Sequence, residues 1–350
     1  MKKILILFIL SFTFLTSSKA THLMGGEITW ECIKSGSDAG KYIFTVKVYR
    51  DCQGVPISTT MGLDVHNVPG LTYIPLQHTQ ANDISPLCNT VDGPNSAFSC
   101  NGTNIGYAGN GVGAVEEHIY ESQPIRIDGT PDSYGWHFTW TSCCRNNAIT
   151  NIANPGGQSF TLRAVMYSYT DPSGTVFPNG NMCYDSSPIF KEKPKSILCT
   201  GYPFSYSHLA FDVELDSLSY SWAEPLGDDF MYNPANPNSI ALPFAAPYSV
   251  NSPIPGNPTL NNENGEISFN SNTAGVFVTC VKVESFKCGQ LVAEVFRDVN
   301  VALISCGTLP NGAQNSPPVI TSPLGPQNWI TTLNPSTGLP SYETTVMAGE

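Results

Sequence analysis

The segment YIFTVKVY at residues 42–49 alternates with a period of two, so its even-numbered side chains, all apolar or aromatic, fall on one face. Three further segments repeat this alternation, at residues 160–169, 276–283 and 291–303. β-branched and aromatic residues fill these runs, as a half-buried strand requires, whereas an amphipathic helix would show a period near 3.6. The alternation therefore predicts β-strands in all four segments.

Glycine and proline separate these runs and bear on the fold class. The chain has 30 Gly and 28 Pro, which stand with Asn and Ser between the alternating segments and leave little room for long helices. Because the strands differ in length and the connections are long, a sandwich is favoured over a barrel. The predicted class is all-β, with tandem immunoglobulin-like β-sandwiches and long loops.

The first twenty residues have the form of a secretory signal peptide. Two lysines precede an apolar run at residues 4–15, and Ser18 and Ala20 are small residues at the two positions that a signal peptidase recognises. The apolar run is shorter than the roughly 20 residues that span a bilayer as a helix. We therefore predict cleavage near Ala20, export to the medium or the outer cell surface, and no transmembrane segment.

The charge of the chain bears on its partners. Its formal net charge is −12, and an acidic protein of this kind is unsuited to binding nucleic acid or an anionic membrane. The expected partner is an extracellular surface, a polysaccharide or a protein ligand.

Eleven cysteines lie outside the predicted signal peptide, and in an exported protein they are expected to form disulfides. The sequence contains no CxxC pair, which is the spacing typical of zinc ligands. Sequence spacing favours the pairs Cys32–Cys52, Cys88–Cys100 and Cys280–Cys288, and separate partners for the adjacent Cys143 and Cys144, with a vicinal disulfide as the alternative. An odd count leaves at least one thiol unpaired within the chain. The disulfide candidates are Cys32, Cys52, Cys88, Cys100, Cys143, Cys144, Cys183, Cys199, Cys280, Cys288 and Cys306.

Gly, Pro and Asn clusters also suggest domain boundaries. We expect a first β-sandwich unit at residues 21–185 and a second at 186–306, interrupted by a proline-rich loop at 232–258. Residues 307–350 hold a linker and too few strands for a sandwich core, so we expect the start of a further, incomplete domain.

Four blocks together resemble one protein family. They are THLMGGEITW at residues 21–30, VYRDC at 48–52, EEHIY at 116–120 and SCCRN at 142–146. In this order they resemble the N-terminal region of large Bacteroidetes surface proteins that are labelled gliding-motility-associated or carry a type IX secretion sorting domain. The resemblance implies an extracellular protein of immunoglobulin-like modules with a role in adhesion or gliding motility.

The second unit is similar to bacterial cadherin-like repeats. Its segment AFDVELDSLSYS at residues 210–221 follows their acidic pattern D-x-D-G-D-x-L-x-Y, except that Glu214-Leu215 replaces the central Asp-Gly. Asp212, Glu214 and Asp216 alternate, so in a strand their carboxylates would point the same way and bind calcium, which prefers oxygen ligands. The alternative is a solvated, negatively charged strand end.

Aromatic side chains also alternate, at Tyr134, Trp136, Phe138 and Trp140. Large aromatic residues at a period of two usually fill the core of a sandwich, which is the favoured interpretation. The alternative is a glycan-binding platform made by Tyr134, Trp136 and Trp140, since flat rings stack on sugars.

The sequence contains no complete catalytic motif. G-x-S-x-G, HExxH and EF-hand spacings are all missing. We therefore predict that the chain is no enzyme but a secreted or cell-surface, adhesin-like or structural module that presents loops on disulfide-stapled sandwiches. The alternative is a secreted glycan-binding module or an appendage of a carbohydrate-active enzyme.

Overall fold

The computed structural model describes residues 23–52, 54–85, 100, 115–178 and 183–305, and the backbone of two short strands at 330–333 and 340–343. The predicted signal peptide, Cys88 and Cys306 lie outside these residues. Within the described part, the regular secondary structure is almost all strand, which confirms the all-β class. None of the described helices is long and apolar enough to cross a membrane.

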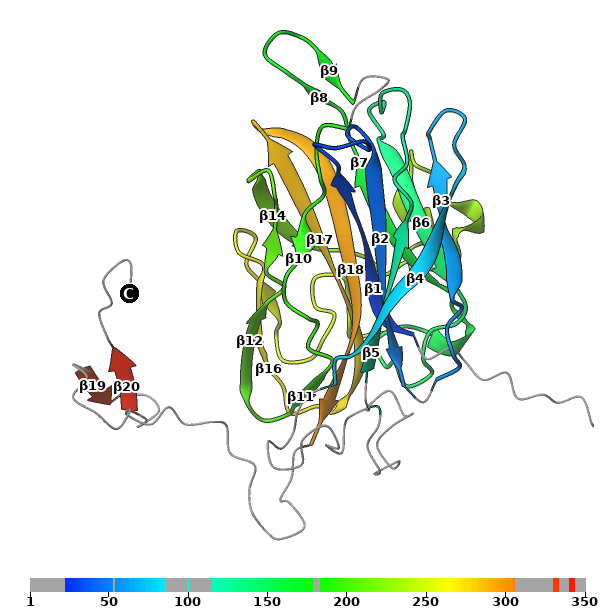
Figure 1. Ribbon diagram of the computed structural model, residues 1–350. Helices are drawn as coiled ribbons and strands as arrows, with labels where there is room; N and C mark the ends of the chain where they lie inside the picture. The colour runs from blue at the N-terminus through cyan, green and yellow to red at the C-terminus, as the bar shows by residue number, and fades with distance from the viewer. Residues whose placement is uncertain are drawn as a thin grey trace, which may run out of the picture. The chain divides into compact units, whose positions relative to one another are not determined.

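Eight antiparallel strands pair in a closed ring (Figure 1). The pairing order is β1-β2-β5-β4-β3-β6-β7-β18, and β18 pairs again with β1. The strands of the ring are β1 (Leu23–Cys32), β2 (Tyr42–Asp51), β3 (Thr60–His66), β4 (Tyr73–Asp83), β5 (Val115–Ser122), β6 (Trp136–Ser142), β7 (Phe160–Met166) and β18 (Gln290–Ile304).

Two strands turn the corners of this ring. β4 pairs with β3 through residues 73–77 and with β5 through residues 76–83. β18 pairs with β7 through residues 293–295 and with β1 through residues 297–299. The ring is therefore a flattened one, in which β1, β2 and β5 form one layer and β3, β6 and β7 form the other.

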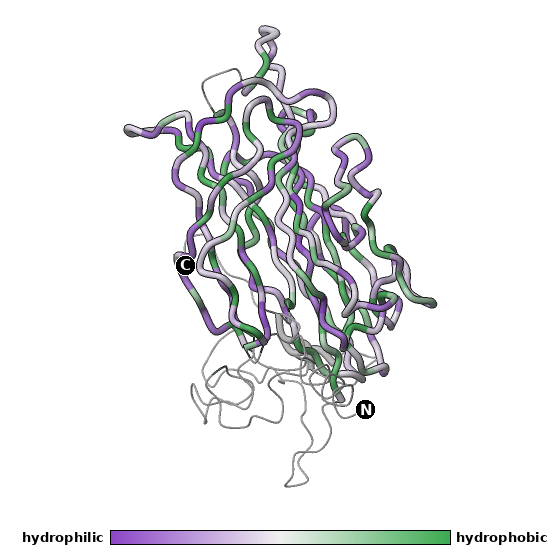
Figure 2. Tube along the Cα trace, turned by 90° about the vertical axis from the view of Figure 1, so that its right-hand side faces the viewer, coloured by the Kyte–Doolittle hydropathy of each residue, from purple (hydrophilic) through white to green (hydrophobic). Residues whose placement is uncertain are grey.

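The core lies between the two layers. Phe44 of β2 packs on Phe138 of β6 with ring centroids 4.5 Å apart, and Trp30 of β1 packs on the same ring at 6.1 Å. The period of two explains this, because alternate side chains of each strand point inward. Apolar and polar residues accordingly alternate along the strands in Figure 2. Aromatic packing between the layers thus fixes their separation.

Glycines allow β1 to fit between β2 and β18. A Cβ at Gly25 would collide with the backbone of Asp298, and a Cβ at Gly26 would lie 2.6 Å from the carbonyl oxygen of Lys47. The GG dipeptide of the first sequence block therefore has a structural reason, the close approach of three backbones.

The second part of the chain extends the same sheet. β17 (Gly275–Lys287) pairs along the other edge of β18, and β14 (Ser217–Trp222) pairs with β17. A small sheet packs its apolar residues into the same core. It consists of β12 (Pro203–Ser207), β15 (Thr259–Leu260) and β16 (Glu266–Asn270).

Short elements complete this part. β11 (Ile197–Cys199) pairs with β18 in parallel, and a small hairpin (β8–β9), a two-stranded sheet (β10–β13) and 3₁₀ turns lie in the connections. They are β8 (Tyr169–Thr170), β9 (Val176–Phe177), β10 (Ile189–Phe190), β13 (Ala210–Phe211), η2 (Pro155–Gly157), η3 (Asp229–Met231) and η4 (Pro237–Ile240).

The two predicted sandwich units share β18. Residues up to Ser305 form one compact unit, and residues from Cys306 onward form another. The predicted boundary at residue 185 falls inside the first unit, because β18 pairs with β1 and β7. A tandem arrangement of sandwiches is therefore not confirmed. In the second unit, β19 (Ile330–Leu333) and β20 (Pro340–Glu343) form an antiparallel hairpin.

Disulfides form, but the pairs favoured by sequence spacing are wrong. Cys32 is bonded to Cys183 and Cys52 to Cys100, each with Cα atoms 5.5 Å apart, and Cys199 is also disulfide-bonded. Spacing misled because ring closure brings distant strands together, so that the Cys32 bridge spans 151 residues.

The remaining described cysteines also depart from expectation. Cys143 and Cys144 form the vicinal disulfide that was the less favoured alternative. Cys280 and Cys288 are both free, the first buried and the second exposed. Cys280 lies near the middle of β17, where it pairs with Asp298, whereas Cys288 lies in the turn after the strand, so the two thiols are too far apart along the extended strand for a hairpin disulfide.

Candidate functional site

Two of the sequence blocks behind the family resemblance are tied to β18 by buried ion pairs. Glu27 of the first block accepts hydrogen bonds from Arg297 of β18 through both carboxylate oxygens, and Tyr49 donates to it at 3.0 Å. Both charged side chains are 1% exposed. Burial alone would raise the pKa of Glu27, but the charges of Arg297 and Lys47 hold that pKa below its usual value. This pair ties β1 to β18.

A second buried pair ties the SCCRN block to the same strand. Arg145 Nη2 lies 2.7 Å from Asp298 Oδ2 and also donates to the carbonyl oxygen of Leu226 at 3.0 Å. Its guanidinium lies 4.7 Å from the ring centroid of Phe160. Arg145 and Asp298 therefore stabilise the fold, because leaving either buried charge unpaired would be costly.

The predicted calcium ligands lie in a turn rather than a strand. The chain leaves β13 at Phe211 and enters β14 at Ser217, and Leu215 has a φ of 63°. Asp212 points inward and accepts hydrogen bonds from the backbone nitrogens of Glu214 and Asp216, at 3.0 and 3.1 Å. The alternation was misread because this carboxylate caps a turn.

The other two carboxylates of that triplet are paired with lysines. Lys34 Nζ lies 3.2 Å from Glu214 Oε1, and Lys287 Nζ lies 2.6 Å from Asp216 Oδ2. Among the described residues, the single group of three ligand atoms close enough to share an ion includes none of these carboxylates. The geometry therefore gives no support to calcium binding by this triplet.

The aromatic row fills the core, as the favoured interpretation predicted. Trp136 and Phe138 are fully buried and Trp140 is 8% exposed, so a platform of Trp136 and Trp140 for glycan stacking is wrong. Tyr134 alone is exposed, at 51%. Trp136 and Trp140 point inward because they share the face of Phe138, which packs against the other layer.

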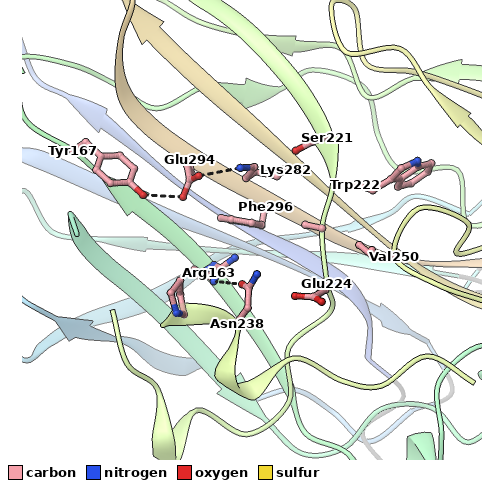
Figure 3. Close-up of a pocket in the computed structure, with 12 residues that line it drawn as sticks. Arg163, Tyr167, Ser221, Trp222, Glu224, Asn238, Val250, Lys282, Glu294 and Phe296 are labelled. Atoms are coloured by element: carbon pink, nitrogen blue, oxygen red, sulfur yellow. Dashed lines mark hydrogen bonds and ion pairs between the residues drawn. The ribbon is translucent and has the colours of Figure 1, made fainter. Parts of the chain in front are cut away.

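A groove on the outside of the sheet was not predicted. It has a volume of about 410 Å³ and lies beside β7, β14, β17 and β18 (Figure 3). We call it the outer groove and define it by Arg163, Tyr167, Glu224, Asn238, Lys282 and Glu294. A volume of this size lies within the range of small-ligand sites, about 300–1,000 Å³.

The strands aim these side chains outward by their period of two. Arg163 lies between the buried Leu162 and Ala164 on β7, and Lys282 lies between Val281 and Val283 on β17. Asn238 comes from η4 in the proline-rich loop, and Glu224 lies two residues after the end of β14. The groove therefore joins polar residues of three core strands to one irregular wall.

One side of the groove is a paired network. Lys282 Nζ lies 2.8 Å from Glu284 Oε1 and 3.1 Å from Glu294 Oε1, and Tyr167 donates to Glu294 Oε2 at 3.0 Å. Burial alone would lower the pKa of Lys282, but the two carboxylates hold it above its usual value. These residues fix one another in place.

The other side offers unsatisfied groups. Arg163 lies 4.1 Å over the Phe296 ring and donates to Asn238 Oδ1 at 3.0 Å, whereas its buried Nε has no partner. Within the described part of the chain, the Glu224 carboxylate makes no hydrogen bond or ion pair, and Figure 3 draws none to it. The groove thus combines a free acceptor with amide and hydroxyl donors, which suits binding of a polar ligand.

The irregular wall is held on the sheet by an aromatic anchor. Tyr232 packs on His66 with centroids 4.7 Å apart, and its hydroxyl lies 2.5 Å from His137 Nδ1. Burial lowers the pKa of His137 to about 4, so this imidazole is neutral at ordinary pH. The loop that carries Asn238 is therefore attached to β3 and β6.

Comparison with known proteins does not identify a family for this chain. No protein-family model, no curated protein and no solved structure matches the chain.

Proposed function

We propose that this chain is a non-catalytic, secreted or cell-surface module of an adhesin-like or structural kind, which contacts an extracellular ligand through its outer groove and loops. The observation that carries the proposal is the fate of two charged residues in the sequence blocks, Glu27 and Arg145. Both are buried in ion pairs with β18, Glu27 with Arg297 and Arg145 with Asp298. Residues used in this way hold strands together and are not available to a substrate.

The disulfides support export. Two bridges join distant parts of the chain, Cys32 to Cys183 and Cys52 to Cys100. Such bridges persist in oxidising compartments and are rare in the cytoplasm. Together with the apolar N-terminal run, they favour a location outside the cell.

The proposed link to gliding motility and to Bacteroidetes surface proteins rests on the sequence blocks alone. The same is true of the immunoglobulin-like and cadherin-like character of the modules. An all-β scaffold hosts many functions, so the fold supports a binding role without selecting the ligand.

A test on cells addresses the location and the role together. Intact cells of the producing bacterium are treated with a protease, and peptides from residues 23–305 are followed by mass spectrometry. We expect these peptides to be released from intact cells or found in the medium, and a deletion strain to attach less well to a polysaccharide-coated surface. Peptides protected until lysis, with attachment unchanged, would contradict the proposal.

The alternative is a glycan-binding module, which the outer groove favours. Glu224, Asn238 and the Ser221 hydroxyl line the groove and supply acceptors and donors, which is what sugar hydroxyls require. The charges of Arg163 and Lys282 balance those of Glu224 and Glu294, so a neutral polysaccharide suits the groove better than an anionic one.

Affinity electrophoresis distinguishes the adhesin-like proposal from the glycan-binding alternative. The purified chain is run through gels that contain xylan, mannan or laminarin, with alginate as the anionic control. Retardation by a neutral polymer that Glu224→Gln removes, and that the exposed control Glu263→Gln keeps, would favour the glycan-binding module. Migration unchanged in every gel would leave the adhesin-like proposal with a protein ligand.

A further inference from the structure

A second cluster is centred on two half-buried histidines of neighbouring strands, whose side chains lie on the same faces of those strands as the core residues Leu76 and Tyr120. His78 lies on β4 and His118 on β5, and His78 Nε2 lies 3.1 Å from His118 Nδ1. Both side chains are only partly buried, and the two ring centroids are 5.2 Å apart. Two imidazole nitrogens at this distance have the separation at which they can share one metal ion with nitrogen–metal bonds of about 2.0–2.1 Å.

A bulge in β4 brings the two rings together. The register between β4 and β5 shifts between His78 and Gln80, so that Thr79 is an extra residue without a partner on β5. His78 lies opposite Tyr120, and His118 is two residues away on the same face of β5. Bulges of this kind often re-aim a side chain next to a functional site.

The second nitrogen of His118 is held by a carboxylate. His118 Nε2 lies 3.0 Å from Glu116 Oε2, and Glu116 in turn forms an ion pair with Arg50. A carboxylate accepts and cannot donate, so Nε2 carries the proton and Nδ1 faces His78 with its lone pair. This carboxylate–histidine arrangement is the one that orients imidazole ligands in metal sites.

We propose that His78 and His118 form a binding site for a divalent transition metal that prefers imidazole, such as Zn²⁺ or Ni²⁺, with Glu116 as the residue that positions His118. Two protein ligands leave the remaining coordination positions to water. The alternative use of the same geometry is a hydrogen bond donated by His78 Nε2 to His118 Nδ1.

This site is independent of the proposed function. It lies on β4 and β5, whereas the outer groove lies beside β7, β14, β17 and β18. Among the described residues, the one group of three potential ligands joins Glu116 to Cys52 and Cys100, which are bonded to each other. The two histidines therefore carry the proposal without help from those cysteines.

Metal titration of the full chain, purified without a polyhistidine tag, tests the site. Thermal unfolding is followed in chelator, in Zn²⁺, in Ni²⁺ and in Ca²⁺, and binding is measured by calorimetry. We expect one equivalent of Zn²⁺ or Ni²⁺ to bind and to raise the midpoint, because a ligand that binds only the folded state stabilises it. Ca²⁺ should have no effect at this site.

Variants assign the effect to the two imidazoles. His78→Ala and His118→Ala should each remove that equivalent, whereas the exposed neighbour variant Gln80→Ala should retain it. Glu116→Gln should weaken binding about 10-fold or more, the size of effect expected from an orienting partner. His78→Gln provides a milder change if His78→Ala does not fold.

Two results would overturn the proposal. One is a wild-type chain that binds no equivalent of Zn²⁺ or Ni²⁺. The other is binding that persists at the same affinity in both histidine variants. Loss of attachment in the deletion strain has no bearing on this site, so the proposed function and the metal site can fail separately.

Discussion

The Glu27–Arg297 pair and the Lys282–Glu294 pair each include one residue of β18, yet their surroundings differ. The first is 1% exposed on both sides and is bonded through both carboxylate oxygens. The second is 24% and 15% exposed and opens into the outer groove. Buried pairs are costly to break and hold the ring closed, whereas partly exposed pairs contribute little to stability and remain available to a ligand.

Breaking the buried pair should give the largest effect. Arg297→Met leaves the buried Glu27 with only Lys47, 3.5 Å away, as a cationic partner, so we expect the free energy of unfolding to fall by about 3–5 kcal/mol. Denaturant titration measures this. The double variant Glu27→Gln/Arg297→Met should recover part of the loss, because it removes the unpaired charge. A loss below about 1 kcal/mol in the single variant would show that the pair does not close the ring.

Removing the long disulfide should have the next largest effect. Cys32 and Cys183 are 151 residues apart in sequence, so the bridge restricts a large loop in the unfolded chain. The double variant Cys32→Ala/Cys183→Ala should lose about 2–5 kcal/mol of stability. The same change at Cys52 and Cys100, which are 48 residues apart, should cost somewhat less. A larger cost at the shorter loop would contradict this ordering.

A pH effect is expected at Asp185, which is buried beside Lys287. Burial raises the pKa of Asp185 to about 7, above its value near 3.9 in an unfolded chain. The folded state therefore takes up this proton first, and the contribution of Asp185 to stability should rise as pH falls from about 8 to about 4. Asp185→Asn should remove that part of the pH dependence. Identical profiles for both proteins would argue against the shift.

Breaking the groove pair should have the smallest effect. Lys282→Met removes a partly exposed ion pair, so the expected loss is about 1 kcal/mol or less. Glu294 keeps its hydrogen bond from Tyr167, which limits the cost further. Denaturant titration of both variants compares their losses in the free energy of unfolding. Equal losses would contradict the claim that the buried Glu27–Arg297 pair stabilises the protein more than the Lys282–Glu294 pair does.

The strands were predictable, because each carries its own local pattern. The segment at residues 42–49 lies in β2, and the segment at 276–283 lies in β17. Aromatic residues at a period of two correctly indicated a core around Phe138. Local alternation reports which face of a strand is buried, and that signal needs no knowledge of the partner strand.

Closure of the ring and the outer groove were not predictable from local patterns. Gly25 pairs with Val299, which lies at the far end of the described ring in sequence. No local feature of either segment indicates the other as its pairing partner. The groove draws on three long strands and a loop, so its residues are scattered from Arg163 to Glu294. One signal was present, the outward Lys282 and Glu294 within otherwise apolar strands, where a charge on a core strand marks its outer face.

The acidic triplet shows how alternation misleads when a strand is only assumed. Asp212 and Asp216 are four residues apart in a turn, and the Asp212 side chain bonds to the backbone of the same turn. Asp commonly makes such turns, so the acidic pattern was as compatible with a cap as with a strand. The backbone pairing of the segment, and not the spacing of its acidic residues, distinguishes a strand from a turn.

The most direct test of the account is to compare Glu224→Gln with the wild-type chain in both stability and attachment. Because Glu224 makes no hydrogen bond or ion pair with the other described residues, we expect an unchanged free energy of unfolding. We also expect weaker attachment of cells that carry this variant to a polysaccharide-coated surface. Unchanged attachment, with the protein folded and present at the surface, would contradict a role for the outer groove.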